Sequence, residues 1–138
     1  MKKDIILISH GNMSVETLKS AEMILGKTER FSAIGFYDNE SPEILEDKIA
    51  KEIGCSLQSP VWIIVDLFGG TPFNVALKLK QYYSNIEIIT GLSLGLVIES
   101  SFYPMILDHQ LLYHLVDTAR QSIQYVSAES SDDDEVES

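Results

Sequence analysis

The sequence predicts an α/β fold: a single-domain open parallel sheet, of strand order 2-1-3-4, with helices on both faces. Short apolar, β-branched runs alternate along the chain with amphipathic segments. Strands and helices that alternate in this way form parallel sheets through right-handed crossovers. The runs carry no polar alternation, which is typical of strands buried on both faces. A chain of 138 residues suits one domain with a sizeable core.

The strands are expected where the apolar runs lie, at Ile5–Ile8, Phe31–Phe36, Val61–Asp66 and Ile86–Ile89. Their β-branched and aromatic residues favour extended structure. In the common small version of such a sheet the strand order reverses between the first and third strands, and ligands bind at the carboxyl ends of the strands there. The residues after these two strands are therefore the first place to look for a site.

Capping signals predict the helices. Ser14 is expected to cap a helix that ends at Gly26, and Ser41-Pro42-Glu43 opens another that Gly54 closes. Thr71-Pro72 repeats the pattern of a capping hydroxyl followed by proline. The last third of the chain is expected to hold a short helix after Ser93, a helix from Asp108 to Arg120 and a short strand at Ile123–Val126.

Charge divides the chain into two unequal parts. The domain is expected over residues 1–127, and residues 128–138 are expected to form a disordered acidic tail, because six of them are acidic. The body carries ten basic and fifteen acidic residues, a net charge of −5 with no basic stripe. This balance argues against nucleic acid and anionic membrane surfaces as partners.

Composition also bears on the cellular compartment and on the use of metals or cofactors. The longest apolar runs are far too short to span a membrane, and the residues after Met1 do not resemble a signal peptide. The single cysteine, Cys55, excludes an internal disulfide and a cysteine zinc site. His109 and His114 make a poor metal pair, since no acidic residue lies between them. We therefore expect a cytoplasmic protein that uses neither a metal nor another cofactor.

His10 and Asp66 are the leading candidates for a functional site. His10 follows the first strand, and Asp66 ends the third. With strand order 2-1-3-4 they lie side by side where the order reverses. A carboxylate fixes the tautomer of a histidine and makes its ring more basic. The other ring nitrogen is then free to act as a nucleophile, a base or a ligand.

A glycine turn and a helix start follow Asp66. Gly69, Gly70 and the first amides of the helix after Thr71 can cradle an anion. The Thr71 hydroxyl is either only a helix cap or also a donor to that anion. Together with His10, this cradle indicates phosphoryl chemistry.

Three other kinds of site are not expected. The P-loop pattern GxxxxGK[ST] and the dinucleotide pattern GxGxxG are absent, and we expect no serine-hydrolase nucleophile elbow.

Two segments carry a family resemblance. The first comprises His10-Gly11, Ser14, Leu18 and residues 20–26, and the second runs from Val65 to Asn74 as VDLFGGTPFN, with a weaker match at Glu40-Ser41-Pro42. In these segments the chain resembles the enzyme IIA component of the mannose-family phosphoenolpyruvate-dependent sugar phosphotransferase system. The resemblance covers residues 3–126.

The resemblance implies a phosphocarrier. His10 would accept a phosphoryl group from the phosphohistidine of the carrier protein HPr and pass it to the IIB component. IIB phosphorylates sugar during transport through the membrane proteins IIC and IID. Asp66 matches the carboxylate that orients the active histidine, and Thr71 matches a residue that contacts the phosphoryl group, beside Gly69 and Gly70. The residues expected at the rim, where partners dock, are Phe68, Met23 and Ser14.

The resemblance also implies a cytoplasmic homodimer, peripheral at the membrane through the transporter complex. In the family the last strand, here Ile123–Val126, is exchanged to pair antiparallel with the partner's sheet. Two stretches depart from the family pattern. Asp38-Asn39 stands where Pro-Gly is frequent, and residues 91–95 read GLSLG where Gly-Val-Asn-x-Pro is common. No alanine-proline linker to a IIB domain is present, so we expect IIB as a separate chain.

Three alternative functions remain open from the sequence. The domain could be a regulatory binding module, whose phosphorylation state alters its binding to a regulator. It could be the phosphotransfer subunit of dihydroxyacetone kinase, which shares the fold and uses an equivalent histidine. The segments around Met23 and Thr71 favour the sugar-system component over this subunit. A receiver domain phosphorylated on Asp66 would need a cluster of acids after the first strand, where the sequence has Ser9-His10-Gly11.

Overall fold

The computed structural model describes residues 3–54 and 59–128, and within them it confirms the predicted sheet. The strands are parallel and lie in the order β2-β1-β3-β4. Their bounds are Ile5–His10 for β1, Phe31–Phe36 for β2, Val61–Val65 for β3 and Ile86–Thr90 for β4. Cys55 and residues 129–138 of the predicted tail lie outside the described residues.

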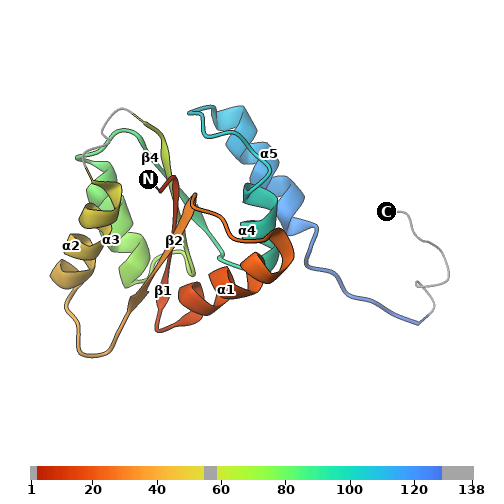
Figure 1. The fold of residues 1–138 in the computed structure, drawn as a ribbon, viewed down its shortest axis with the longest axis horizontal. Helices are drawn as coiled ribbons and strands as arrows, with labels where there is room; N and C mark the ends of the chain where they lie inside the picture. The colour runs from red at the N-terminus through yellow and green to blue at the C-terminus, as the bar shows by residue number, and fades with distance from the viewer. Residues whose placement is uncertain (1–2, 55–58, 129–138) are drawn as a thin grey trace.

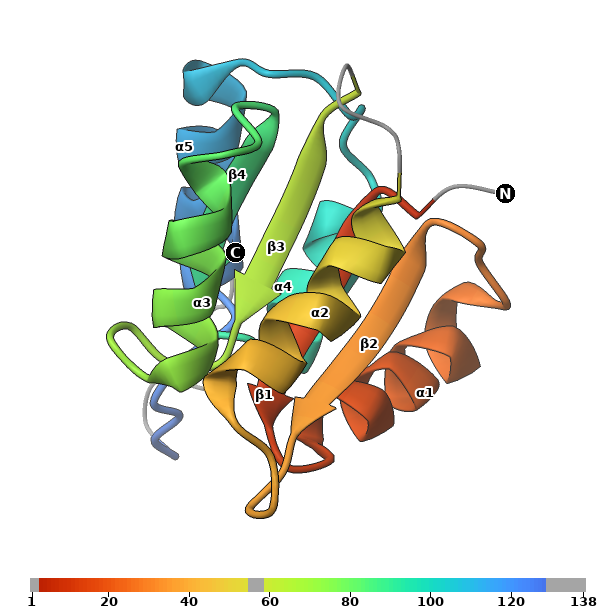
Figure 2. The same ribbon diagram turned by 90° about the vertical axis from the view of Figure 1, so that its left-hand side faces the viewer.

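Helices cover both faces of the sheet, as predicted (Figures 1 and 2). One face carries α2 (Pro42–Ile53) and α3 (Thr71–Lys80). The other carries α1 (Met13–Leu25), α4 (Leu94–Ser100) and α5 (His109–Arg120). Each face has its own apolar core, and between them the residues of Ile5–Ile8 and of β3 are completely buried. No helix in the described part of the chain is long and apolar enough to cross a membrane.

Of the three predicted helix caps, Ser41 is confirmed, and those expected at Ser14 and Thr71 are not. The Ser41 and Ser93 hydroxyls accept hydrogen bonds from Ile44 N and Leu96 N, and the Asp108 carboxylate accepts from Gln110 N and Leu111 N. In contrast, α1 begins at Met13 after Asn12, and α3 begins at Thr71 after Gly70. Ser14 and Thr71 therefore lie inside their helices, and neither residue is the cap that we expected.

The end of the described chain departs from the prediction. Ile123–Val126 forms no strand in this structure, and the segment leads away from the body (Figure 1). Its apolar side chains are largely exposed to solvent: Ile123 is 81%, Tyr125 89% and Val126 70% exposed. A strand needs a pairing partner, and no strand of residues 3–54 and 59–128 pairs with this segment. The edge strand β4 pairs with β3 alone among the described strands.

Candidate functional site

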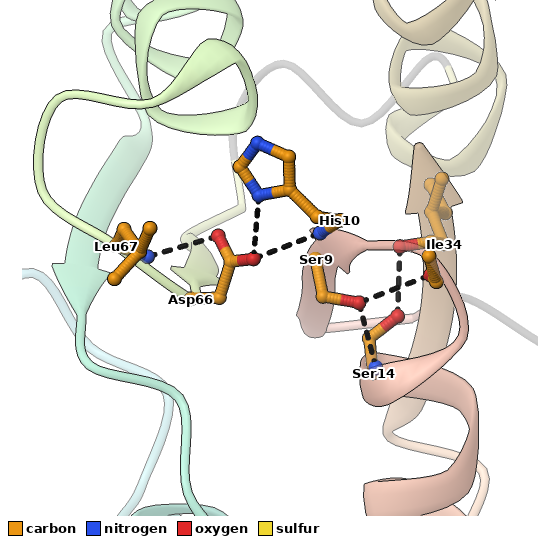
Figure 3. Close-up of polar contacts among 7 residues, drawn as sticks. Ser9, His10, Ser14, Ile34, Asp66 and Leu67 are labelled. Carbon is orange, nitrogen blue, oxygen red and sulfur yellow. Dashed lines mark hydrogen bonds and ion pairs between the residues drawn. The ribbon is translucent and has the colours of Figure 1, made fainter. Parts of the chain in front are cut away.

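The structure brings His10 and Asp66 together at the carboxyl end of the sheet. β1 and β3 are neighbours, with Ile8 opposite Val65, so the residues that follow these strands meet at one edge. One oxygen of Asp66, Oδ2, accepts hydrogen bonds from the backbone N–H and from ring Nδ1 of His10, both at 2.8 Å. The other oxygen, Oδ1, accepts from Leu67 N at 2.9 Å (Figure 3).

This contact fixes the ring chemistry of His10. An ionised carboxylate can only accept hydrogen bonds, so Nδ1 carries the proton that it donates to Asp66. In the neutral ring the lone pair then lies on Nε2. The side chain of His10 is 49% exposed, whereas that of Asp66 is only 9% exposed. The nucleophilic nitrogen is therefore accessible, and the group that orients it is sheltered.

Two opposing influences act on the charge of Asp66. Burial tends to raise the pKa of Asp66. Hydrogen bonds from the His10 backbone and ring, the charge of that ring and the Leu67 N–H together outweigh burial, so the pKa of Asp66 lies below its ordinary value. The carboxylate is thus ionised at neutral pH and can stabilise positive charge on the imidazole.

The start of α3 lies against the free side of the His10 ring. A Cβ placed on Gly70 would lie 3.0 Å from ring Cε1 and 3.7 Å from Nε2, so the bare backbone of Gly70 packs onto the ring. Gly69 turns the chain into this position with φ +90°. The first N–H groups of a helix have no intrahelical partner and carry its positive dipole end. An anion bonded to Nε2 would therefore face a helix N-terminus.

Thr71 is the first residue of α3, and its hydroxyl makes no hydrogen bond with the described residues. The sequence left two roles open for this hydroxyl, a helix cap only or also a donor to an anion, and it is not the cap, because Gly70 occupies that position. The hydroxyl is consequently available to donate to an anion beside His10.

Ser14 is completely buried and does not lie at the rim, which corrects the expectation. Its N–H donates to Ser9 Oγ at 2.7 Å, and its hydroxyl donates to Ile34 O at 2.8 Å (Figure 3). The turn after β1 is held close to β2 by the bond from Gly11 N to Phe36 O at 2.7 Å. This tight turn starts α1 two residues earlier than expected and places Ser14 inward, where it anchors the helix.

The two apolar candidates for the rim differ in position. Phe68 is 80% exposed in the loop after Asp66, and its ring centroid lies 4.7 Å from that of Phe73. Met23 is 88% exposed, but it lies in the last turns of α1. It is about 15 Å along the helix axis from Met13, which begins the helix near the site. The structure therefore places Phe68 at the site, whereas Met23 lies on the exposed surface of α1, away from the rim where it was expected.

Residues 91–95 form a regular connection despite their departure from the family pattern. Gly91 N and Leu92 N both donate to Val65 O, which joins the end of β4 to the end of β3. GLSLG also matches the GxSxG spacing of serine nucleophiles. Ser93 has extended backbone dihedrals, and its hydroxyl accepts the Leu96 N–H at 3.1 Å. Ser93 is thus the N-cap of α4.

The sequence analysis missed Tyr37, which lies beside the His10 turn. Its hydroxyl donates a hydrogen bond to Asn12 Oδ1. The departure at Asp38-Asn39 lies in the turn between Tyr37 and Glu40, which Glu40 N closes onto Tyr37 O at 2.9 Å. No local sequence pattern predicts a contact between residues so far apart in sequence.

In the described residues no three His, Cys, Asp or Glu side chains come together as a metal site.

The comparisons with known proteins agree on one family. The family model of the PTS system fructose IIA component, EIIA-man, matches residues 4–127. The sorbose-specific EIIA component of Lacticaseibacillus casei is 31% identical over 96 residues, which are 70% of each chain. The mannose-specific EIIAB component of Escherichia coli K12 is 31% identical over 97 residues, which are 70% of this chain and 30% of that protein.

A solved structure extends the similarity to almost the whole body. The mannose/sorbose-specific IIA subunit of the phosphotransferase system from Enterococcus faecalis superposes with a TM-score of 0.80 at 30% identity. The match covers 92% of this chain and 96% of that subunit. From the family model, the sequence relatives and this superposition together, we conclude that the chain belongs to the mannose-family IIA components of the sugar phosphotransferase system.

Proposed function

We propose that this protein is a phosphocarrier in which His10 accepts a phosphoryl group from phospho-HPr and passes it to a IIB component. Because the chain belongs to this family, it is a component of the phosphotransferase system for sugar transport. The observation that supports His10 as the carrier is its ring geometry. Nδ1 is tied to Asp66 at 2.8 Å, and Nε2 is exposed beside Gly70.

The transfer step follows from that geometry. The Nε2 lone pair attacks the phosphorus of phospho-HPr in line with the bond that breaks. A nitrogen–phosphorus bond forms at His10 while the donor's nitrogen–phosphorus bond breaks, and its electron pair returns to the donor ring. Positive charge develops on the His10 ring, and the ionised Asp66 stabilises it through the Nδ1 hydrogen bond. Transfer to IIB reverses these roles.

The phosphoryl oxygens have donors on the side of α3. The amides around Gly69 and Gly70 and the unpaired Thr71 hydroxyl can donate to the equatorial oxygens as they spread their charge. Phosphorylation on Asp66 itself, as in a receiver domain, is disfavoured. Three N–H groups already bind its two oxygens, and the His10 ring lies against it.

A protein partner can cover the site from the solvent side. Leu67 and Phe68 are 60% and 80% exposed beside the half-exposed His10. Exposed apolar side chains next to a reactive group are typical of docking surfaces. We assign HPr and IIB to this surface in turn. The protein would then work in the cytoplasm, at the membrane only through IIC and IID.

We also infer a homodimer. A groove of about 760 Å³ runs along the edge strand β4 between α3 and α5, with Phe73, Ile88, Leu112 and Val116 among its apolar lining. The exposed Ile123–Val126 segment of a second copy supplies apolar side chains and a backbone that forms no strand within its own chain. Antiparallel pairing of this segment with β4 would satisfy the sheet edge.

The deciding experiment is phosphotransfer from labelled phosphoenolpyruvate through enzyme I and HPr, with wild type and His10→Ala side by side. The proposal expects acid-labile, base-stable label on the wild type alone. Label on His10→Ala would remove His10 from the role of carrier. No label on either protein would leave the fold without this activity, and a regulatory binding module would become the leading function.

A further inference from the structure

Tyr37 is held from several sides next to the turn that carries His10. It follows β2 directly, and its hydroxyl donates to the side-chain oxygen of Asn12, the N-cap residue of α1. Asn12 lies two residues after His10, on the opposite side of the turn from Asp66. The contact therefore joins the end of β2 to the reactive turn.

The remaining groups of Tyr37 are also engaged. Its N–H donates to Glu40 Oε1 at 3.1 Å, and its carbonyl accepts from Glu40 N at 2.9 Å. Lys48 Nζ lies 5.2 Å from the centroid of its ring, a cation–π distance. Lys48 also pairs with Glu40 Oε2 at 2.5 Å and donates to Gly35 O at 3.2 Å. The hydrogen bond from Lys48 lowers the pKa of Glu40, so the Glu40 carboxylate is ionised at neutral pH.

Gly35 shows how closely Tyr37 and the His10 turn approach each other. A Cβ on Gly35 would overlap the Gly11 carbonyl oxygen and lie 2.5 Å from the Tyr37 hydroxyl oxygen. The phenol and the turn are thus packed against the same bare backbone. Gly11 has φ +60°, and because glycine can adopt many backbone conformations, the shape of this turn depends on the contacts around it.

We propose that Tyr37 is a positioning residue for phosphoryl transfer, which acts by holding the turn from His10 to Asn12 in place. Asp66 fixes the rotation of the ring and the N–H of His10. Tyr37 fixes the far side of the same turn through Asn12. With both sides held, Nε2 stays beside Gly70 while a partner docks. A surface tyrosine, 37% exposed, contributes little to the core, so its network serves the turn. This inference rests on the proposed role of His10.

The first test is Tyr37→Phe, which removes only the hydroxyl. Single-turnover acceptance from phospho-HPr is measured over a range of donor concentrations. We expect the maximal rate to fall by about threefold to tenfold, the scale of one hydrogen bond, with an unchanged half-saturating concentration. Tyr82→Phe is the matched control, because Tyr82 is 71% exposed beyond the far end of α3. It should transfer at the wild-type rate.

A double-mutant cycle tests whether the effect passes through Asn12. Asn12→Ala should lower the maximal rate as much as Tyr37→Phe does, and the two together should lower it no further. A nitrogen NMR spectrum of His10 should show a mixture of ring tautomers or broadened signals in both single variants, with unchanged melting temperatures. A destabilised fold would instead lower the melting temperature and leave the ring spectrum of the folded fraction unchanged.

The outcomes separate this inference from the proposed function. If wild type accepts phosphate and Tyr37→Phe accepts it at the same maximal rate, Tyr37 has no positioning role. A change confined to the half-saturating concentration would make Tyr37 a partner contact and also overturn the inference. Additive losses in the cycle would contradict the route through Asn12. If wild type accepts no phosphate, the proposed function itself fails.

Discussion

The His10 site and the C-terminal segment differ in how complete they are within one chain. At the site the groups that orient His10 already have partners: Asp66 accepts three hydrogen bonds, and the turn after His10 is bonded to β2. At the other region the apolar side chains of Ile123–Val126 project into solvent, and the groove along β4 is open. The chemistry is organised within the chain, whereas the segment requires a second surface to bury it.

The two regions should therefore affect different measured properties, the rate of transfer and the free energy of association or folding. Hydrogen bonds in the site orient a reacting atom, so their loss should appear in the rate of transfer. Apolar burial at the β4 groove should appear in association and in stability, because it depends on area removed from water. Variants in one region should therefore leave the property of the other region largely unchanged.

The largest effect is expected from ending the chain after Ser122, which removes the exposed segment. Each large apolar side chain that becomes buried contributes about 1.5–3 kcal/mol. Losing Ile123, Tyr125 and Val126 should therefore convert the dimer to a monomer in sedimentation equilibrium. Label on His10 should persist in the monomer.

The matched control ends the chain after Ser127, which removes the acidic tail but keeps the segment. The chain that ends after Ser127 should remain a dimer and transfer phosphate at the wild-type rate. A dimer that survives the truncation after Ser122 would show that another surface holds the two copies together.

Asp66→Asn is expected to have the largest effect on the reaction itself. The amide is similar in size but uncharged, so it cannot stabilise positive charge on the ring of His10. Loss of a preorganised electrostatic group costs about 100- to 1,000-fold in rate. Rapid-quench phosphotransfer measures the change, and sedimentation should report an unchanged dimer. Transfer close to the wild-type rate would mean that Asp66 only holds the backbone.

Thr71→Ala should have a smaller effect in the same direction. Hydrogen bonds to charged groups contribute about 1.5–3 kcal/mol, which corresponds to roughly 10- to 100-fold in rate. Thr71→Ser keeps the hydroxyl and should restore most of the rate. Because the hydroxyl bonds no described residue, the melting temperature of Thr71→Ala should stay near that of wild type. Equal rates for Ala and Ser would contradict a role in binding the phosphoryl group.

The sequence was sufficient for the sheet and for the pair His10 and Asp66, because both depend on local signals combined with topology. Four buried runs and their alternation with helices define the strand order, and the order brings the strand ends together. Ser14 was misplaced by two helical positions and Thr71 by one. Where a helix starts depends on the turn before it, and after β1 a long-range bond from Gly11 N to Phe36 O sets that turn.

Other features depended on contacts that no local pattern contains. The spacing of Met23 does not decide which way its side chain faces, and only the packing of α1 places it in solvent. Tyr37 and Asn12 are 25 residues apart and meet through the register of β1 with β2. Ile123–Val126 has the residue types of a strand, yet a strand also requires a neighbouring strand to pair with. Context beyond the local sequence decided each of these.

The smallest expected effect concerns acid stability, and it separates the two contacts that His10 makes with Asp66. The pKa of Asp66 is lowered in the folded protein, so in acid the unfolded chain binds a proton more readily than the folded chain does. The stabilisation is present above the ordinary value of about 3.9 and is lost as pH falls through the lowered pKa. Urea unfolding at pH 7, 4 and 3 should show wild type losing stability relative to Asp66→Asn on acidification. His10→Ala keeps the backbone N–H that donates to Asp66 Oδ2, so part of the pH dependence should remain in this variant. If wild type and Asp66→Asn respond equally to acid, the hydrogen bonds seen at Asp66 do not stabilise its ionised form.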